Sequence, residues 1–231
     1  MAVRRAAVAR RTGVWQKRRG VEHKPRTRKR HFSMIRDFSL ADLITLSNGF
    51  AGTGTILATL QYMDTRDQRI LWLAFALPLF AMVFDFLDGR VARWRHRSSP
   101  LGRELDSLAD LISFGVAPAV LGFAVGLRGA WDALILVYFV SCGLSRLARY
   151  NVTAEDLADE SGKVRYFEGT PIPTSVILVA MLAVLTWMGR IDDQLPFGRI
   201  RFLGGAFHPL VMVYWLSGSA MISKTLRIPK P

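Results

Sequence analysis

Four aspartates lie between positions 85 and 110 in two otherwise apolar stretches of the chain: Asp85, Asp88, Asp106 and Asp110. A charged side chain at the centre of a bilayer costs about 2.5–3.5 kcal/mol on insertion scales, and such residues usually serve a function. Four carboxylates at this spacing repel one another unless cations lie between them. The residues therefore predict a divalent-metal site inside a membrane protein.

The spacing also predicts how the site is built. Residues three or four apart share a helix face, so Asp85 pairs with Asp88 and Asp106 pairs with Asp110. The segment 93–105 between the pairs is long enough to turn the chain back, so the two acidic faces can oppose each other. No cluster of His or Cys lies nearby, and an all-oxygen site selects hard ions such as Mg²⁺, Mn²⁺ or Ca²⁺ over zinc.

Small and basic residues accompany the aspartates. Gly89 follows Asp88, where the missing side chain lets a ligand approach the helix, and Arg93 and Arg103 flank the acidic cluster. Arginines bind phosphate oxygens in bidentate fashion, so carboxylate-held metals beside them predict a pyrophosphate substrate. Two alternatives are an acidic helix–helix contact paired with the arginines and a divalent-cation transporter with the aspartates along its ion path.

The complete pattern is Asp-x2-Asp-Gly-x2-Ala-Arg-x8-Gly-x3-Asp-x3-Asp, and every position is matched between Asp85 and Asp110. It resembles the signature of the CDP-alcohol phosphatidyltransferases, and the likeness in layout extends over about residues 38–227. The resemblance implies an enzyme that transfers a phosphatidyl group from a CDP-linked lipid to an alcohol and releases CMP.

The resemblance also implies roles for individual residues. The four aspartates would hold two divalent ions, Mg²⁺ or Mn²⁺, and Asp110 would also act as general base on the incoming hydroxyl. The residues expected to bind the CDP-lipid are Asn48, Asp88, Gly89, Arg93, Ser99 and Gly102. Taken by itself, Asn48 equally fits an interhelical hydrogen bond.

A second region bears on the alcohol. Arg146-Leu-Ala-Arg149-Tyr150-Asn151 is followed by Phe167-Glu-Gly-Thr-Pro-Ile-Pro173. Both blocks resemble motifs of the phosphatidylserine synthase branch of the family, although Tyr150 replaces the common Phe. The resemblance implies L-serine as acceptor and CDP-diacylglycerol as donor, with Arg146, Arg149 and Asn151 binding serine. Arginines that snorkel at a helix end are the alternative for this pair, and glycerol 3-phosphate or inositol phosphate is the alternative acceptor.

The elements that position these residues are apolar helices. Apolar residues make up 51% of the chain, and six segments approach the ~20 residues that cross a bilayer. They lie at about 41–63, 70–94, 105–127, 130–150, 171–189 and 203–223. The sequence therefore predicts an all-α integral membrane protein, a six-transmembrane-helix bundle with a basic N-terminal cytosolic segment.

Charge predicts the domain limits and the orientation. Basic residues exceed acidic ones by 31 to 18, and much of the excess lies in residues 1–37. We expect this part to be a flexible cytosolic segment that is attracted to anionic lipid rather than to nucleic acid. A six-helix domain at 38–227 and a tail at 228–231 follow it.

The basic 93–103 connection and the basic C-terminal residues place both termini and the aspartates on the cytosolic side. We expect a bacterial-type inner (cell) membrane as the location. The family resemblance implies a homodimer.

Overall fold

The computed structural model describes residues 40–95, 100–153, 166–202, 204–223 and 227–229. The chain divides into two units, Met1–Asp37 and Phe38–Pro231, and every described residue belongs to the second. The basic N-terminal segment of the sequence-based prediction lies outside the described residues, so its properties and the domain boundaries stay predictions.

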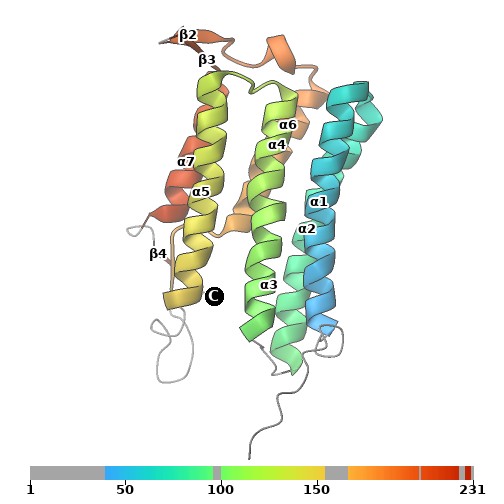
Figure 1. Ribbon diagram of the computed structural model, residues 1–231, viewed down its shortest axis with the longest axis vertical. Coiled ribbons are helices and arrows are strands. Elements are labelled where there is room, and N and C mark those ends of the chain that lie inside the picture. Colours follow the sequence, from blue (N-terminus) through green and yellow to red (C-terminus); the bar gives the residue numbers. More distant parts are fainter. Residues whose placement is uncertain (1–39, 96–99, 154–165, 203, 224–226, 230–231) are drawn as a thin grey trace, which may run out of the picture. The chain divides into compact units, whose positions relative to one another are not determined.

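The second unit is a bundle of helices that run up and down along one direction (Figure 1). The helices are α1 (Leu40–Thr65), α2 (Gln68–Arg95), α3 (Pro100–Asp110), α4 (Ala117–Val125), α5 (Ala130–Thr153), α6 (Val176–Trp187) and α7 (Met212–Ile222). A π-helical segment, Leu111–Val116, joins α3 to α4, so that the two form one continuous rod. Two antiparallel pairs of three-residue strands accompany the helices: β1 (Tyr166–Glu168) with β4 (Arg227–Pro229), and β2 (Ile200–Phe202) with β3 (Gly205–Phe207).

Four described helical stretches are long and apolar enough to cross a membrane: Leu40–Thr65, Gln68–Val91, Leu101–Val125 and Ala130–Val152. They correspond to the first four predicted spans. The third begins before its predicted start at 105, because Pro100 fits the first turn of a helix, where its missing N–H costs nothing.

The last two predicted spans are shorter apolar helices, Ile172–Trp187 and Pro209–Ile222. Two features shorten them. A 3-10 turn, Ile172–Ser175, precedes α6, and the region predicted to open the last span forms the β2–β3 hairpin instead. The count of six spans therefore remains a prediction.

Helix α1 packs along α2 and α3 through a face of small residues. Ala51, Gly52, Thr55, Ala58 and Thr59 are all buried, as expected where membrane helices approach closely. The two threonine hydroxyls donate to carbonyl oxygens one turn earlier, at 3.0 Å and 2.7 Å. These bonds satisfy polar atoms within the helix, because lipid offers them no partner.

Helix α7 packs against α5 and also meets α4. The Phe139 and Tyr214 rings meet edge to face, with centroids 5.3 Å apart. The Tyr214 hydroxyl donates to the Pro118 carbonyl oxygen at 2.9 Å. Gly122 leaves room for that hydroxyl, since a Cβ there would lie 2.8 Å from it.

A buried polar junction fixes the end of the bundle that carries β2 and β3. Asp132, in the first turn of α5, is fully buried and accepts hydrogen bonds from the backbone N–H groups of Gly129 and His208, both at 2.8 Å. The His208 Nδ1 atom lies 2.5 Å from the same carboxylate. One side chain thus ties the start of α5 to the segment that leads into α7.

Candidate active site

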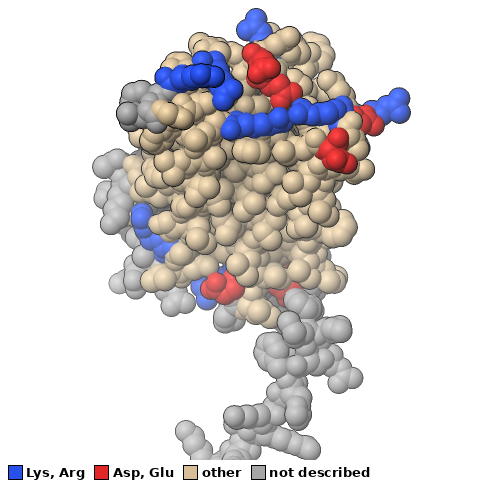
Figure 2. Space-filling view, turned by 45° about the horizontal axis from the view of Figure 1, so that its top comes forward, with Lys and Arg blue, Asp and Glu red and all other residues tan. Residues whose placement is uncertain are grey.

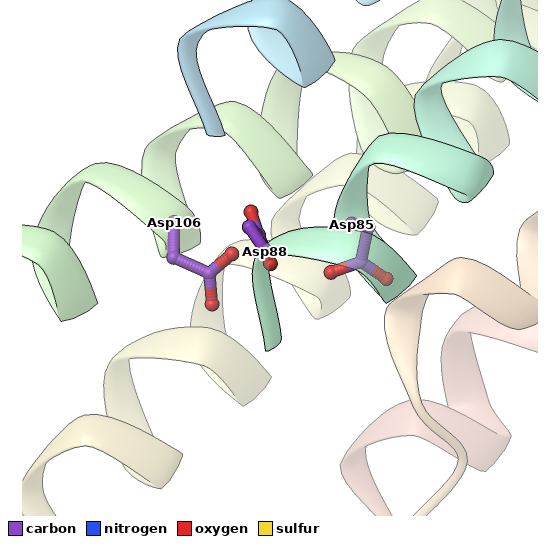
Figure 3. A group of neighbouring side chains, drawn as sticks. All are labelled: Asp85, Asp88 and Asp106. Atoms are coloured by element: carbon purple, nitrogen blue, oxygen red, sulfur yellow. The ribbon is translucent and has the colours of Figure 1, made fainter. Parts of the chain in front are cut away.

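Three of the four aspartates form a tight cluster at the end of the bundle opposite β2 and β3. Asp85 and Asp88 lie on α2 and Asp106 lies on α3, and one carboxylate oxygen from each lies within 4.8 Å of the others. Figure 3 shows the three side chains directed toward one another across the two helices. The predicted opposition of two acidic helix faces is therefore present.

Asp88 is fixed by a neighbour on α1. The Thr45 hydroxyl lies 2.8 Å from its Oδ2 atom and 3.1 Å from the Ala41 carbonyl oxygen. Since a carboxylate is the stronger acceptor, the hydroxyl proton belongs mainly to the bond with Asp88. Both Thr45 and Asp88 are buried, so water has little access to this bond.

Asp110, the last residue of α3, lies one helical turn after Asp106 and is held separately. The Asn48 side-chain amide donates to its Oδ1 atom at 3.0 Å. The Asn48 backbone carbonyl in turn accepts a hydrogen bond from the Ser113 hydroxyl at 2.9 Å. All three residues are buried. A chain of two hydrogen bonds thus links Asp110, α1 and the π-helical segment.

That linkage requires a close approach of α1 to the π-helical segment. A Cβ on Gly52 would lie 2.3 Å from the Ser113 Oγ atom and 2.7 Å from its Cα atom. Glycine is therefore the residue that fits between the two backbones. A π-helical turn is rare and is frequently found at functional sites; here it follows Asp110 directly and presents Ser113 to α1.

The cluster has the properties of a site for a hard cation. Carboxylate oxygens are the ligands that such ions take, and the Asp106 Oδ1 atom is buried with no hydrogen-bond partner among the described residues. Three carboxylates this close repel one another unless a cation lies between them. The group can hold a metal ion.

The structure describes only part of the predicted CDP-lipid set. Gly89 follows Asp88 on α2, and a Cβ there would meet no described atom within 4 Å. Gly102 lies half-buried on α3. The Arg93 side chain and Ser99 lie outside the described part. Packing within the described chain therefore gives no reason for glycine at position 89.

Arg146 is a mostly buried basic group on α5, close to the acidic site. Its guanidinium carbon lies 5.9 Å from the centre of the Tyr150 ring, within cation–π range. Its charge interacts with that of Asp110. The Nε atom is buried and has no partner among the described residues, so a buried donor remains beside the carboxylates.

The other two predicted serine ligands make contacts within the protein. The Arg149 Nη1 atom lies 3.4 Å from the carbonyl oxygen of Ile222, the last residue of α7. The Asn151 Nδ2 atom donates to the Ser107 hydroxyl at 3.0 Å, and its Oδ1 atom lies 3.2 Å from the same oxygen. Arg149 thus connects α5 to α7, and Asn151 connects α5 to α3.

The sequence analysis did not identify Thr45, Ser107 and Ser113. Their hydroxyl groups contact Asp88, Asn151 and the Asn48 carbonyl oxygen, respectively. A partial signal existed for Thr45, because it lies three residues before Asn48 and so shares its helix face. No comparable signal marked Ser113, because its position depends on the π-helical turn.

Comparison with known proteins decides the family. The sequence model of the CDP-alcohol phosphatidyltransferase family matches residues 38–216, which include all four aspartates, the helices α1 to α6 and the start of α7. The chain belongs to the CDP-alcohol phosphatidyltransferase family. The resemblance carried by the Asp85–Asp110 pattern is confirmed, and the protein is an integral membrane enzyme.

Three relatives have names that specify serine. The CDP-diacylglycerol–serine O-phosphatidyltransferase of Saccharomyces cerevisiae is 50% identical over 206 residues, which are 87% of this chain and 74% of the yeast protein. The enzyme of the same name from Mycobacterium tuberculosis is 31% identical over 64% of this chain and 48% of its own length. An archaetidylserine synthase of Methanothermobacter thermautotrophicus is 34% identical over 62% of this chain and 56% of its own length.

The close approach at Gly52 leads to a prediction. Gly52→Ala should lower stability by about 1–3 kcal/mol, because the added methyl group pushes α1 away from Ser113. Thermal unfolding of the purified protein in detergent measures this as a lower midpoint. Gly49→Ala is the matched control, since a Cβ there would meet Ala109 Cβ at an ordinary 3.5 Å. Equal midpoints for the two variants would contradict the packing described for α1.

Proposed function

We propose that this protein transfers the phosphatidyl group of CDP-diacylglycerol to L-serine, giving phosphatidylserine and CMP. The observation that carries the proposal is the meeting of Asp85, Asp88 and Asp106 beside Asp110, in a chain half identical to an enzyme named for this reaction. The serine acceptor is also supported by the archaeal relative, whose name specifies serine as well.

Asp85, Asp88, Asp106 and Asp110 would hold two divalent ions, Mg²⁺ or Mn²⁺. The all-oxygen donor set and the unpartnered Asp106 Oδ1 atom favour hard cations of this kind. Bound there, the ions supply charge neutralisation for the diphosphate and for the departing CMP.

Asp110 is the proposed general base. The serine hydroxyl oxygen attacks the phosphorus that carries the diacylglycerol, the bond from that phosphorus to the CMP oxygen breaks, and the hydroxyl proton passes to Asp110. Asn48 holds Oδ1 of Asp110 by its hydrogen bond, which leaves Oδ2 outside that bond. Asn48 thereby orients the base as well as lying in the proposed CDP site.

The CDP moiety would lie along the start of α3 and the end of α2. The residues assigned to it are Asn48, Asp88, Gly89, Arg93, Ser99 and Gly102. Gly89 supports this assignment, because nothing in the described chain occupies the space where a side chain would stand. A phosphate or sugar of the ligand would then approach the α2 backbone at that point.

Arg146 is the best-supported serine ligand. Its unpartnered Nε atom lies in a buried position near Asp110, where a guanidinium can pair with the carboxylate of the amino acid. Arg149 and Asn151 complete the proposed set. Their contacts with Ile222 and Ser107 suit them to hold this wall of the site in place.

The membrane arrangement proposed with this function has six spanning helices, α6 and α7 forming parts of the last two. Both termini and the aspartates face the cytosol of a bacterial-type inner (cell) membrane. Residues 1–37 form a basic cytosolic segment, 38–227 form the catalytic domain, and 228–231 form a tail. The enzyme acts as a homodimer.

The direct test is an acceptor panel with purified protein, CDP-diacylglycerol and Mg²⁺ or Mn²⁺. L-serine should support CMP release and formation of the matching lipid, while glycerol 3-phosphate and inositol phosphate should not. Chelation should abolish turnover, and added Mg²⁺ or Mn²⁺ should restore it. A phosphorylated acceptor used in preference to serine would overturn the assignment. Metal entry into liposomes without CMP release would favour a transporter.

Replacement of the base separates chemistry from binding. Asp110→Asn should lower kcat by roughly 10²–10⁴-fold, the usual contribution of a general base, because the amide cannot accept the hydroxyl proton. CDP binding, measured by equilibrium dialysis, should be largely retained. Near-normal kcat in this variant would exclude Asp110 as the base.

Replacing Arg146 should weaken the binding of serine but not that of CDP-diacylglycerol. Arg146→Gln should raise the KM for serine about tenfold or more, because a charge-assisted hydrogen bond to the carboxylate is lost. The KM for CDP-diacylglycerol should stay close to its original value. Arg190→Gln, at an exposed arginine near the other end of the bundle, is the control. An equal rise for both substrates would indicate general damage to the site.

A further inference from the structure

A polar cavity lies at the end of the bundle opposite the aspartates. Its volume is about 360 Å³, within the range of small-molecule sites. The charged and polar side chains that line it are Arg66, Arg128, Arg199, Asp192, Asp193 and His208. They come from connections at the end of the bundle that carries β2 and β3 (Figure 1), and Figure 2 shows basic and acidic side chains gathered at this end. The reaction proposed above uses none of them.

Two of the arginines are held side by side by one carboxylate. The Arg66 Nη1 atom lies 3.0 Å from Asp192 Oδ2, and the Arg128 Nη2 atom lies 3.3 Å from Asp192 Oδ1. Arg128 also donates to the carbonyl oxygens of Phe123 and Ala124, at 3.2 Å and 2.6 Å. A guanidinium carries N–H donors on every nitrogen, so these bonds fix the two groups without using all their donors.

The third arginine, Arg199, is not held by a carboxylate of the described chain. Arg199 is exposed, lines the cavity, and forms no hydrogen bond or ion pair with the rest of the described chain. Three guanidinium groups thus face two carboxylates, and Asp192 is already shared between two of them. The excess positive charge favours an anion, and fixed guanidinium groups match the oxygens of a phosphate.

The backbone around the cavity is strained. Among the described residues, those other than glycine with positive φ are Arg66 at 57°, Asp192 at 52° and Phe197 at 69°. Two of the three line the cavity, and the third lies two residues before Arg199. Gly126 permits this arrangement, since a Cβ there would lie 2.9 Å from the Asp192 backbone. Such conformations cost free energy and cluster at ligand sites.

Apolar side chains border Arg199. Phe197, just before β2, is 80% exposed, and Ile200, the first residue of β2, is 48% exposed. Aromatic and apolar side chains at the end of a membrane bundle contact the headgroup region of a bilayer. A ligand that combines a phosphate with an apolar portion would satisfy the arginines and these two side chains together.

We infer that this cavity binds the phosphate group of an anionic ligand, at a site separate from the aspartates and on the opposite end of the bundle. The shared chemistry is a phosphate held by Arg199 together with the Arg66–Asp192–Arg128 group. Phe197 and Ile200 favour a phospholipid headgroup as its source over a free phosphate in solution.

Isothermal titration of the full-length protein in non-ionic detergent tests this site. The probes are dihexanoyl phosphatidic acid, which is water-soluble, and inorganic phosphate. Arg199→Gln should weaken binding of the lipid about tenfold, because one charge-assisted contact is lost. Arg201→Gln is the matched control, since Arg201 is exposed on β2 and does not line the cavity. Any lipid bound at the aspartate site contributes equally in both variants.

The two probes distinguish the source of the phosphate. If the unaltered protein binds the lipid more tightly than inorganic phosphate, and Arg199→Gln weakens the binding of both, the site takes a lipid headgroup. If the unaltered protein binds the two probes equally tightly, the site takes a soluble phosphate. The thermal unfolding midpoint should be the same for both variants, because Arg199 is exposed and unpaired within the described chain. Equal affinities of the two variants for each probe, or no binding by the unaltered protein, would overturn the inference.

Discussion

The aspartates repel one another in an environment that screens charge poorly, and the rest of the structure must accommodate that repulsion. Oxygens of Asp85, Asp88 and Asp106 lie within 4.8 Å of one another, and Asp110 follows one turn away. Water would weaken such a repulsion, whereas the low dielectric of a helix bundle strengthens it. Cations, hydrogen-bond donors and Arg146 can each offset this repulsion. Cations and arginines also bind phosphate oxygens, and hydrogen bonds orient the carboxylates. The groups that offset the repulsion are therefore the same groups that the proposed reaction uses.

Helix α1 supplies the hydrogen-bond part of that compensation without adding charge. Thr45 donates to Asp88 and Asn48 donates to Asp110, and the two donors are three residues apart on one helix face. The distance between α1 and α3 must be short for both bonds to form. Gly52 against Ser113 secures it, with the π-helical turn bringing Ser113 forward. Gly52 therefore supports the geometry of the candidate active site as well as the packing of α1.

The sequence predicted the grouping of the aspartates because the signals for it are local. Spacing of three or four residues put each aspartate pair on one helix face, and four apolar stretches marked four long helices. The predictions were weaker where structure depends on distant contacts. The hydrophobic stretch at 203–223 resembled a span, yet residues 205–207 pair with residues 200–202 as strands. The Asp132–His208 junction joins residues 76 positions apart, and no pattern along the chain indicates such a pair.

The same reasoning explains why an amino acid suits the proposed acceptor site. In the proposed function the site holds four carboxylates with two divalent ions and also accepts a diphosphate. A phosphorylated alcohol would add further negative charge and would need additional cations near Asp110. Serine adds none overall, because its ammonium group balances its carboxylate. Arg146, buried and with an unused Nε donor, can take the carboxylate, and the acidic cluster attracts the ammonium. An arginine beside Asp110, the proposed general base, therefore favours a zwitterion over a phosphorylated acceptor through charge balance.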